Sequence, residues 1–490
     1  MRLYTILGRV AAIGILTLCC MAPSIDYNHL EYNSSRPNIV LLLADDLGYA
    51  DLSCYGGVPR TPHLDDLASR GIRLTQFYSA APNCTPARAG LLSGRFPTTV
   101  GIYNYMPPAH PMHLRDEVTT IAEMAKEAGY RTGHFGKWHL SNLSPDADLD
   151  QAQPHDQGFD YSLGTTNNSR PSHLNPTNFV RNGQKTGQLE GYSCQIITDE
   201  AMRWLNRGGT EEPFFLYMAY HEPHLKLASP PKLMKHYEQY PEKDQEYYAN
   251  VENMDLAIGR LIEWLDENDM LENTLVVFAS DNGSYHRGSN GNLLGGKSFV
   301  YEGGIRVPGI IHWPDRIPTG VVDHSVASLV DIMPTVCEIM EIENKDFPAM
   351  DGVSLLPLMS GNRLERERPL SWFFYRTFPQ LAMRMDDYMV LAASADTIKH
   401  THPMTEPDMA YIKSLELDTM WAYNLADDPG QNNPLNLSDL EDGDFLRQRV
   451  KRRFKKVQEE APVWSNLPPD NKVKKLKTEW RKLRWDSFSN

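Results

Sequence analysis

Apolar residues over the first two thirds of the chain follow two alternating patterns. Helical segments such as residues 247–265 place apolar side chains every three or four positions. Another helix is expected to begin at Thr120, which forms a capping box with Glu123, and to stop at Gly129. Between the helices lie four strand candidates, residues 38–44, 130–135, 214–220 and 275–279, and all of them except 130–135 are short apolar runs typical of strands buried on both faces of a sheet. This alternation predicts an α/β fold with a largely parallel sheet flanked by helices.

From about residue 370 the pattern changes to shorter, strand-like runs. Asp386-Asp387 suits a hairpin turn between two of them, and Asp428-Pro429-Gly430 suits another turn. We therefore expect a main domain over residues 36–365 and a smaller antiparallel unit over residues 366–440. The expected strands of this unit are residues 372–375, 382–385, 388–391 and 420–425.

The N-terminus differs from the rest of a chain that has 490 residues and, with 41% hydrophobic and 23% charged residues, an ordinary globular composition. Arg2 and Arg9 flank the start of an uncharged apolar run, residues 10–20, that is too short to span a bilayer. Residues 1–24 therefore resemble a secretory signal peptide, which implies export to a periplasmic or extracellular space. Cys19-Cys20 points weakly to a lipoprotein site, but Leu18 does not fit the small residue expected there, so plain export is favoured. No other segment is long and apolar enough to cross a membrane.

Charge is distributed unevenly along this acidic chain, whose formal net charge is −15. Residues 447–484, within a basic C-terminal tail at 441–490, hold 14 lysines and arginines against 4 acidic residues. Such a tail suits an anionic polymer or the acidic face of its own protein. The favoured alternative is an amphipathic helix that packs Val450, Phe454 and Val457 against the body. Aromatic residues for base stacking are sparse there, so no nucleic-acid partner is expected.

Oxygen-bearing side chains follow two of the predicted strands. Asp45 and Asp46 come directly after the predicted strand at residues 38–44, and Asp281 and Asn282 come after the predicted strand at residues 275–279. Open α/β sheets place their ligand sites at these carboxyl ends. Hard oxygen ligands suit Ca²⁺ or Mg²⁺ and not zinc, and three converging carboxylates normally require a cation. The sequence thus predicts a divalent metal site.

A single cysteine lies in a second chemically distinctive run, Cys84-Thr85-Pro86-Ala87-Arg88. Pro86 suits the first helical position and Thr85 is a plausible cap, which places Cys84 at a helix N-terminus, where anions are favoured. Arg88 lies four residues on, so it shares a helix face with Cys84. A sulfur atom, an anion cradle and a guanidinium are therefore expected to converge.

Several motifs together resemble those of the formylglycine-dependent sulfatases, in particular arylsulfatases and N-acetylgalactosamine-6-sulfatases. They are Cys84-x-Pro86-x-Arg88 with the tail Leu92-Ser93-Gly94-Arg95, Gly136-Lys137-Trp138-His139-Leu140, Asp281-Asn282-Gly283, and Lys297 followed by Glu302-Gly303-Gly304-x-Arg306-Val307-Pro308. The resemblance covers residues 37–437 and implies an alkaline-phosphatase-like fold with a mixed sheet. It also implies that a formylglycine-generating enzyme oxidises Cys84, and that the hydrated aldehyde attacks a sulfate ester.

The same resemblance assigns roles to individual residues. Lys137 is expected to orient the formylglycine or the sulfate, and His139 to take a proton from the second diol hydroxyl. Lys297 is expected to bind sulfate and donate a proton to the leaving alcohol, with Arg88 adding positive charge. The implied ligands of a Ca²⁺ ion, or of Mg²⁺, are Asp45, Asp46, Asp281, Asn282 and modified Cys84.

One more histidine is expected to contact the sulfate or the leaving oxygen, and two are available. His224 is favoured as the catalytic residue because Pro230 and Lys232 follow it at a distance that fits the family. His221 stays an alternative substrate-binding residue, because His221-x-Pro223 mimics the form seen in other members.

The leading hypothesis is a sulfuric-ester hydrolase acting on a sulfated carbohydrate or an aryl sulfate. Residues 167–178 are rich in groups that hydrogen-bond sugar hydroxyls. A phosphonate or phosphate monoester hydrolase of the same superfamily is the first alternative, although phosphatases there use Ser or Thr with two zinc ions. A catalytically silent protein that binds sulfated glycans is the second, and the intact set of motif residues disfavours it.

Overall fold

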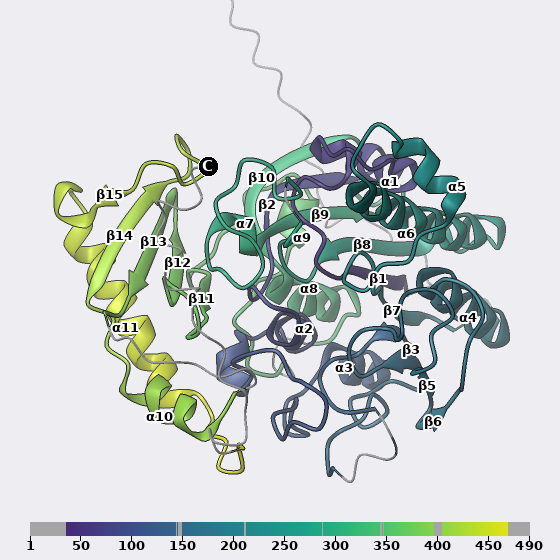
Figure 1. Cartoon of the computed structure of the whole chain (residues 1–490), viewed down its shortest axis with the longest axis horizontal. Coiled ribbons are helices and arrows are strands. Elements are labelled where there is room, and N and C mark those ends of the chain that lie inside the picture. Colours follow the sequence, from purple (N-terminus) through teal and green to yellow (C-terminus); the bar gives the residue numbers. More distant parts are fainter. Residues whose placement is uncertain are drawn as a thin grey trace, which may run out of the picture. The chain divides into compact units, whose positions relative to one another are not determined.

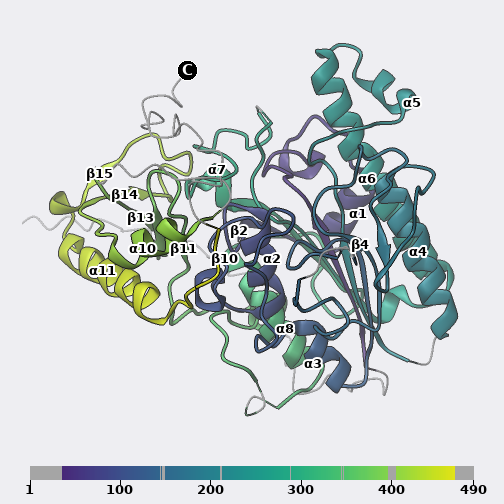
Figure 2. The same ribbon diagram turned by 60° about the horizontal axis from the view of Figure 1, so that its bottom comes forward.

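The computed structural model describes residues 36–143, 145, 149–209, 212–286, 288–343, 345, 347–395 and 404–468. The predicted signal peptide and the end of the basic tail lie outside the described residues. The fold is built on a ten-stranded sheet and a separate five-stranded sheet (Figures 1 and 2). None of the helices in the described ranges has the length and apolar character needed to span a membrane.

The large sheet has the strand order β10-β2-β9-β8-β1-β7-β3-β4-β5-β6. Its centre is parallel, since β1 pairs with both β7 and β8, and β3 pairs with β7 and β4. Strand β9 runs antiparallel to β8 and β2, which makes the sheet mixed. The strands are β1 (Asn38–Ala44), β2 (Ile72–Tyr78), β3 (Arg131–Lys137), β4 (Tyr161–Thr165), β5 (Val180–Arg181), β6 (Gln184–Lys185), β7 (Phe214–Ala219), β8 (Thr274–Ser280), β9 (Arg306–His312) and β10 (Val321–Ser328).

The four predicted strands form the central strands β1, β3, β7 and β8. Three of them, β1, β7 and β8, read as largely apolar sequence because both faces of each strand are covered. Ile39, Leu41 and Leu43 belong to a core with α2, α3 and α8, whereas Val40 and Leu42 belong to a second core with α1, α4 and α6. Two helical layers therefore enclose the sheet (Figure 1).

The helices confirm both helical predictions. Helix α6 covers the predicted amphipathic segment, and α3 begins with the expected capping box between Thr120 and Glu123. The α-helices are α1 (Pro62–Ser69), α2 (Cys84–Ser93), α3 (Ile121–Glu127), α4 (Ser193–Gly208), α5 (Pro231–Met234), α6 (Glu242–Glu267), α7 (Glu302–Ile305), α8 (Ile332–Ile339), α9 (Leu356–Met359), α10 (Glu406–Ser414) and α11 (Gly443–Glu460). Short 3₁₀ turns lie at Ser53–Tyr55, Pro97–Val100, Lys235–Tyr237, Leu271–Asn273, Leu329–Asp331 and Leu437–Asp439.

The smaller sheet is antiparallel, as predicted from the change in pattern. It contains β11 (Ser371–Phe373), β12 (Leu381–Met385), β13 (Tyr388–Ala393), β14 (Thr419–Asn424) and β15 (Leu435–Asn436) in chain order. Asp386, with φ of 49°, makes the expected turn between β12 and β13. The indole of Trp372 donates a hydrogen bond to the carbonyl oxygen of Ser79 at 2.7 Å, which ties this sheet to the loop that precedes α2.

Helix α11 has the amphipathic character expected for the start of the basic tail. Val450, Phe454 and Val457 are buried, and the Phe454 ring packs on Phe373 with centroids 5.4 Å apart. The basic side chains of α11 therefore belong to a helix that packs against the small sheet through its apolar face.

Candidate active site

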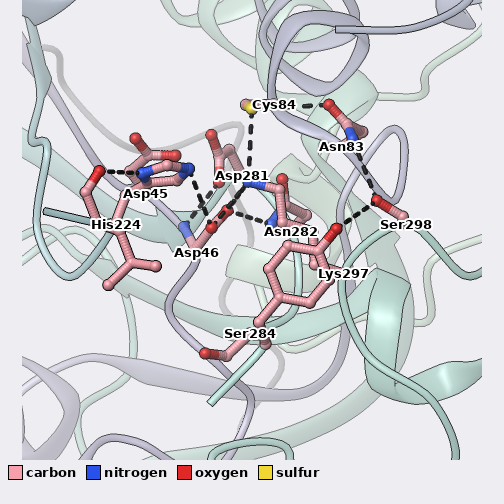
Figure 3. A network of polar contacts seen from close by, with 12 residues as sticks. Asp45, Asp46, Asn83, Cys84, His224, Asp281, Asn282, Ser284, Lys297 and Ser298 are labelled. Carbon is pink, nitrogen blue, oxygen red and sulfur yellow. Dashed lines mark hydrogen bonds and ion pairs between the residues drawn. The ribbon is translucent and has the colours of Figure 1, made fainter. Parts of the chain in front are cut away.

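The polar residues after β1 and β8 form the centre of the site. The two strands pair in parallel register, with Ala44 opposite Ser280, so the residues that follow them leave the sheet side by side. The backbone N–H of Asp46 donates to Asp281 Oδ1 at 3.1 Å, and Asn282 Nδ2 donates to Asp46 Oδ1 at 2.7 Å. The structure thus brings together the four oxygen-bearing residues that the sequence singled out (Figure 3).

Cys84 is the first residue of α2, so its predicted place at a helix N-terminus is confirmed. The predicted cap is wrong. Asn83, in an extended conformation, is the N-cap, while Thr85 Oγ1 accepts a hydrogen bond from the backbone of Met106 at 2.9 Å, and Pro86 is the third helical residue. The helix therefore starts earlier than expected, and the Thr85 hydroxyl binds the neighbouring loop instead of capping the helix.

Arg88 reaches from α2 into the carboxylate cluster and is fully buried. Its Nε and Nη2 donate to Asp281 Oδ2 at 3.1 and 2.7 Å, and its Nη1 donates to the backbone oxygen of Lys137 at 2.9 Å. One guanidinium therefore joins the ends of β3 and β8 to α2. Charge-assisted bonds of this kind are strong because they form away from water.

Two lysines each neutralise one of the paired aspartates. Lys137, the last residue of β3, donates from Nζ to Asp45 Oδ2 at 2.7 Å. Lys297 donates to both carboxylate oxygens of Asp46 at 2.5 and 2.7 Å, and its Nζ lies 3.6 Å from Cys84 Sγ. Lys297 therefore contacts both Asp46 and the predicted nucleophile.

His139 is held with one ring nitrogen engaged and the other unpaired. Its Nε2 lies 2.8 Å from the carbonyl oxygen of Met106, which can only accept, so Nε2 carries the proton. Nδ1 is buried without a hydrogen-bond partner and presents a lone pair. Burial lowers the pKa of His139 well below its usual value, and Lys137 and Arg88 lower it further. The ring is therefore neutral and able to accept a proton at Nδ1.

His221 and His224 lie only three residues apart but face different surroundings. His221 Nε2 lies 2.7 Å from Thr165 Oγ1, the ring packs edge-on to Phe179, and the residue is fully buried. His224 Nε2 lies 3.4 Å from Asp46 Oδ2 and keeps 20% of its side chain exposed. Burial lowers the pKa of His224 to about 4. His224 is thus the partly exposed histidine beside Asp46, and the catalytic role of His224 and the substrate-binding role of His221 both stay predictions.

The electrostatics of the cluster fit a bound cation. Although burial opposes it, Lys137 together with neighbouring cations holds the pKa of Asp45 well below its usual value. Burial and the charge of Asp45 raise the pKa of Asp281. The neighbouring cations therefore do not fully compensate the charge of this third carboxylate. Asp45 Oδ1 and Asn282 Oδ1 are buried with no hydrogen-bond partner. Within the described ranges, Asp45, Cys84 and Asp281 offer ligand atoms within 4.8 Å of one another, as do Asp45, Asp46 and His224.

Some residues of this network carried no sequence signal. Asn83 Nδ2 donates to Ser298 Oγ at 3.3 Å, which links the cap of α2 to the loop that carries Lys297 (Figure 3). Lys137 Nζ also lies 3.5 Å from Asn168 Oδ1, which brings the predicted sugar-binding segment to the site. Only the adjacency of Asn83 to Cys84 hinted at the first contact, and nothing in the sequence pattern indicated Ser298.

Comparisons with known proteins identify the family of the chain. The Sulfatase family model matches residues 37–342, more than half of the chain, and the model "N-sulphoglucosamine sulphohydrolase, C-terminal" matches residues 294–458. The N-acetylgalactosamine-6-sulfatase of Canis lupus familiaris is 34% identical over 386 residues, which are 72% of this chain and 71% of that protein. Arylsulfatase A of Homo sapiens is 33% identical over 430 residues, which are 81% and 82% of the two chains.

Solved structures share the fold. The crystal structure of Ps i-CgsB in complex with k-i-k-neocarrahexaose superposes with a TM-score of 0.75 and 25% identity, covering 93% of this chain and all (100%) of that one. The phosphonate monoester hydrolase of Agrobacterium radiobacter, at 18% identity and a TM-score of 0.58 over 87% and 96% of the two chains, shares the architecture alone. The predicted alkaline-phosphatase-like fold and the predicted family are therefore both confirmed: the chain belongs to the sulfatase family and is a sulfuric ester hydrolase.

Proposed function

We propose that this sulfatase releases inorganic sulfate from a sulfated carbohydrate, using a formylglycine made from Cys84 and a divalent metal ion, Ca²⁺ in preference to Mg²⁺. The observation that carries the proposal is the position of Cys84. It stands at the N-terminus of a buried helix, with Lys297 Nζ 3.6 Å from its sulfur atom and with Asp45 and Asp281 beside it. A sulfate ester bound there would meet a nucleophile and concentrated positive charge at one point.

The residues that would hold the metal are Asp45, Asp46, Asp281, Asn282 and the modified residue at position 84. Their carboxylate and amide oxygens are hard ligands of the kind that Ca²⁺ prefers. When bound, the ion would polarise a sulfate oxygen and the formylglycine would supply the oxygen nucleophile. The buried oxygens of Asp45 and Asn282 that have no hydrogen-bond partner support this assignment.

The lysines and Arg88 supply the remaining positive charge. Lys137 and Lys297 approach the cluster from β3 and from the loop after β8, so their ammonium groups are fixed before substrate arrives. Fixed cations stabilise charge that grows on the nonbridging oxygens without reorganising during the reaction. Arg88 Nη1 and Nη2 hold Lys137 and Asp281 in this arrangement.

Two groups are suited to move protons. His139 accepts at Nδ1, because Nε2 is committed to the Met106 carbonyl, and this suits removal of a proton from the hydroxyl at position 84. Asp46 raises the pKa of Lys297 well above its usual value despite burial, so Lys297 is charged and can hydrogen-bond the leaving oxygen. His224, which keeps 20% of its side chain exposed, is the second candidate contact for that oxygen.

The substrate class is supported by three observations. The relatives include N-acetylgalactosamine-6-sulfatases, and Ps i-CgsB was solved with k-i-k-neocarrahexaose. Asn168, from the polar segment after β4, reaches Lys137. We also propose that residues 1–24 direct export, because Arg2 and Arg9 flank the start of an apolar run that is too short to span a bilayer.

The direct test is sulfate release after co-expression with a formylglycine-generating enzyme. Modification at position 84 would first be confirmed by mass spectrometry, and sulfated mono- and oligosaccharides and one aryl sulfate would then be screened by ion chromatography. We expect release from at least one sulfated saccharide. No release from any ester by fully modified protein would overturn the proposal, and faster hydrolysis of a phosphonate monoester would favour the phosphohydrolase alternative.

Calcium is expected to stabilise the folded protein. A ligand that binds only the native state at one hundred times its Kd contributes about 2.7 kcal/mol to the free energy of unfolding. Thermal unfolding of EDTA-treated protein should therefore shift to higher temperature on addition of CaCl₂. Asp281→Asn should lose most of this shift, because the substitution removes a charged ligand while keeping the shape of the side chain.

The matched control for this experiment is Asp255→Asn. Asp255 is also a buried carboxylate, but it accepts the backbone N–H groups of His63 and Leu64 at the start of α1, away from the cluster. Its substitution should lower the melting temperature and leave the calcium-induced shift intact. An equal shift in both variants would place the cation elsewhere.

A further inference from the structure

Tyr285 is an aromatic residue that stays exposed beside the reacting centre. It follows Asn282 in the loop after β8 and is 57% exposed. The Nζ atom of Lys297 lies 5.6 Å from the centre of its ring, and the same Nζ lies 3.6 Å from Cys84 Sγ. The ring is thus separated from the predicted nucleophile by a single side chain.

An exposed aromatic residue alone needs no explanation, but this one is fixed on both sides along the chain. Before it, the backbone N–H of Ser284 donates to Asn290 Oδ1 at 2.9 Å, and Ser284 Oγ lies 3.1 Å from the hydroxyl of Tyr247 on α6. After it, the ring of His286 stacks on Tyr247 with centroids 3.9 Å apart and planes 6° from parallel. The backbone that carries Tyr285 is therefore pinned to α6.

The hydroxyl group fixes the orientation of the ring as well. It lies 3.0 Å from Ser298 Oγ, the atom that also accepts from Asn83 Nδ2 (Figure 3). Thr377, in the loop between β11 and β12, donates to the backbone oxygen of Ser298 at 2.8 Å. The ring is consequently connected through Ser298 to Asn83, the residue that precedes Cys84. A ring held in place loses little conformational entropy when a ligand covers it.

We propose that Tyr285 is a stacking platform for the pyranose ring that carries the scissile sulfate. This inference rests on the proposed function and names a subsite for the sugar. A sulfate held between Lys297 and the cluster directs its carbon skeleton outward, and the Tyr285 ring is the exposed aromatic surface beside that path. The C–H groups on one face of a pyranose are weakly positive and apolar, and they pack well on the electron-rich face of a tyrosine.

The test separates the sugar from the sulfate. N-acetylgalactosamine 6-sulfate serves as the ring-bearing probe and inorganic sulfate as the probe without a ring. Their dissociation constants would be measured by calorimetry with Cys84→Ala protein, which cannot turn over. Adding Tyr285→Ala should weaken the sugar sulfate about tenfold, which corresponds to about 1.4 kcal/mol, and change the affinity for inorganic sulfate less than twofold. Tyr285→Phe keeps the ring and should stay within about threefold for both probes.

Phe445→Ala is the matched control, because Phe445 on α11 is exposed to the same extent, 57%, as Tyr285. It should leave both affinities unchanged. Equal binding of the sugar sulfate with and without Tyr285 would overturn the inference, as would a parallel loss of affinity for inorganic sulfate, since that would mean that Tyr285 acts through Lys297. Because binding is measured without turnover, a failure of the proposed hydrolysis appears separately, as absent sulfate release by the modified wild-type protein.

Discussion

Cys84→Ala is expected to lower kcat/KM for sulfate release by at least about 10³-fold, the scale of loss seen when a covalent nucleophile is removed. The substitution removes the thiol group whose oxidation yields formylglycine. It should disturb the fold little, because Cys84 Sγ makes only long contacts, at 3.6 Å, with Asn83 Oδ1 and Lys297 Nζ. Sulfate release by ion chromatography and thermal unfolding would be measured on the same preparations.

Cys337→Ala provides the control for this result. Cys337 is also buried, in α8, and takes part in none of the site contacts described above, so its loss should lower stability modestly and leave kcat/KM within about twofold of wild type. Full activity in Cys84→Ala would refute the formylglycine mechanism. If both Cys84→Ala and the modified wild type bound a sulfated saccharide and neither released sulfate, the chain would instead be the silent glycan-binding protein.

Arg88→Met is expected to have the second large effect, on stability and on activity together. Removing one partner of a buried ion pair costs about 3–5 kcal/mol, because it leaves the other charge unpaired. Here the stranded group is Asp281, whose pKa burial and Asp45 already raise. Urea unfolding should show the loss of stability, and sulfate release should fall with it, because Lys137 and Asp281 lose the group that positions them.

Two further variants make this prediction specific. Arg88→Lys keeps the positive charge but cannot reproduce both the contact to Asp281 and that to the Lys137 carbonyl, so it should be intermediate in stability. Arg306→Met also removes a buried arginine, one paired with Glu302 at 3.2 Å outside the cluster. It should destabilise the protein while leaving kcat/KM within a few-fold of wild type. Equal catalytic losses in Arg88→Met and Arg306→Met would mean that Arg88 acts only through global stability.

The centre of the large sheet could be predicted from sequence because burial on both faces leaves a continuous apolar run, as in β1. Strands at its less buried side left no such trace. In β10 only the last two residues are buried, and β2 places Arg73, Thr75 and Gln76 at half-buried positions. Their place in the sheet depends on long-range pairing, because β2 pairs with β9 and with β10, and both lie more than 200 positions away from it in the sequence.

The membership of the site could be predicted more fully than its connections. Strand ends and motifs indicated Asp45, Lys137 and Asp281, since parallel neighbours deliver their following residues to one edge. Which groups pair across the cluster was not encoded locally: the Lys297–Asp46 pair joins residues 251 positions apart. The choice between His221 and His224 likewise depends on one turn, in which the backbone of His224 donates to His221 and sends the two rings to different environments.

Helix α2 has a consequence for the timing of maturation. All ten of its residues are buried, and Cys84 itself is only 3% exposed. A modifying enzyme has to bind several residues around its target, and the folded chain exposes none of the residues of α2 at its surface. On the proposed mechanism, Cys84 must be oxidised while the chain is still unfolded. The active fraction of a preparation therefore depends on the rate of oxidation relative to the rate of folding. Slower folding, for example at lower temperature, would then yield a larger share of molecules that carry the modification.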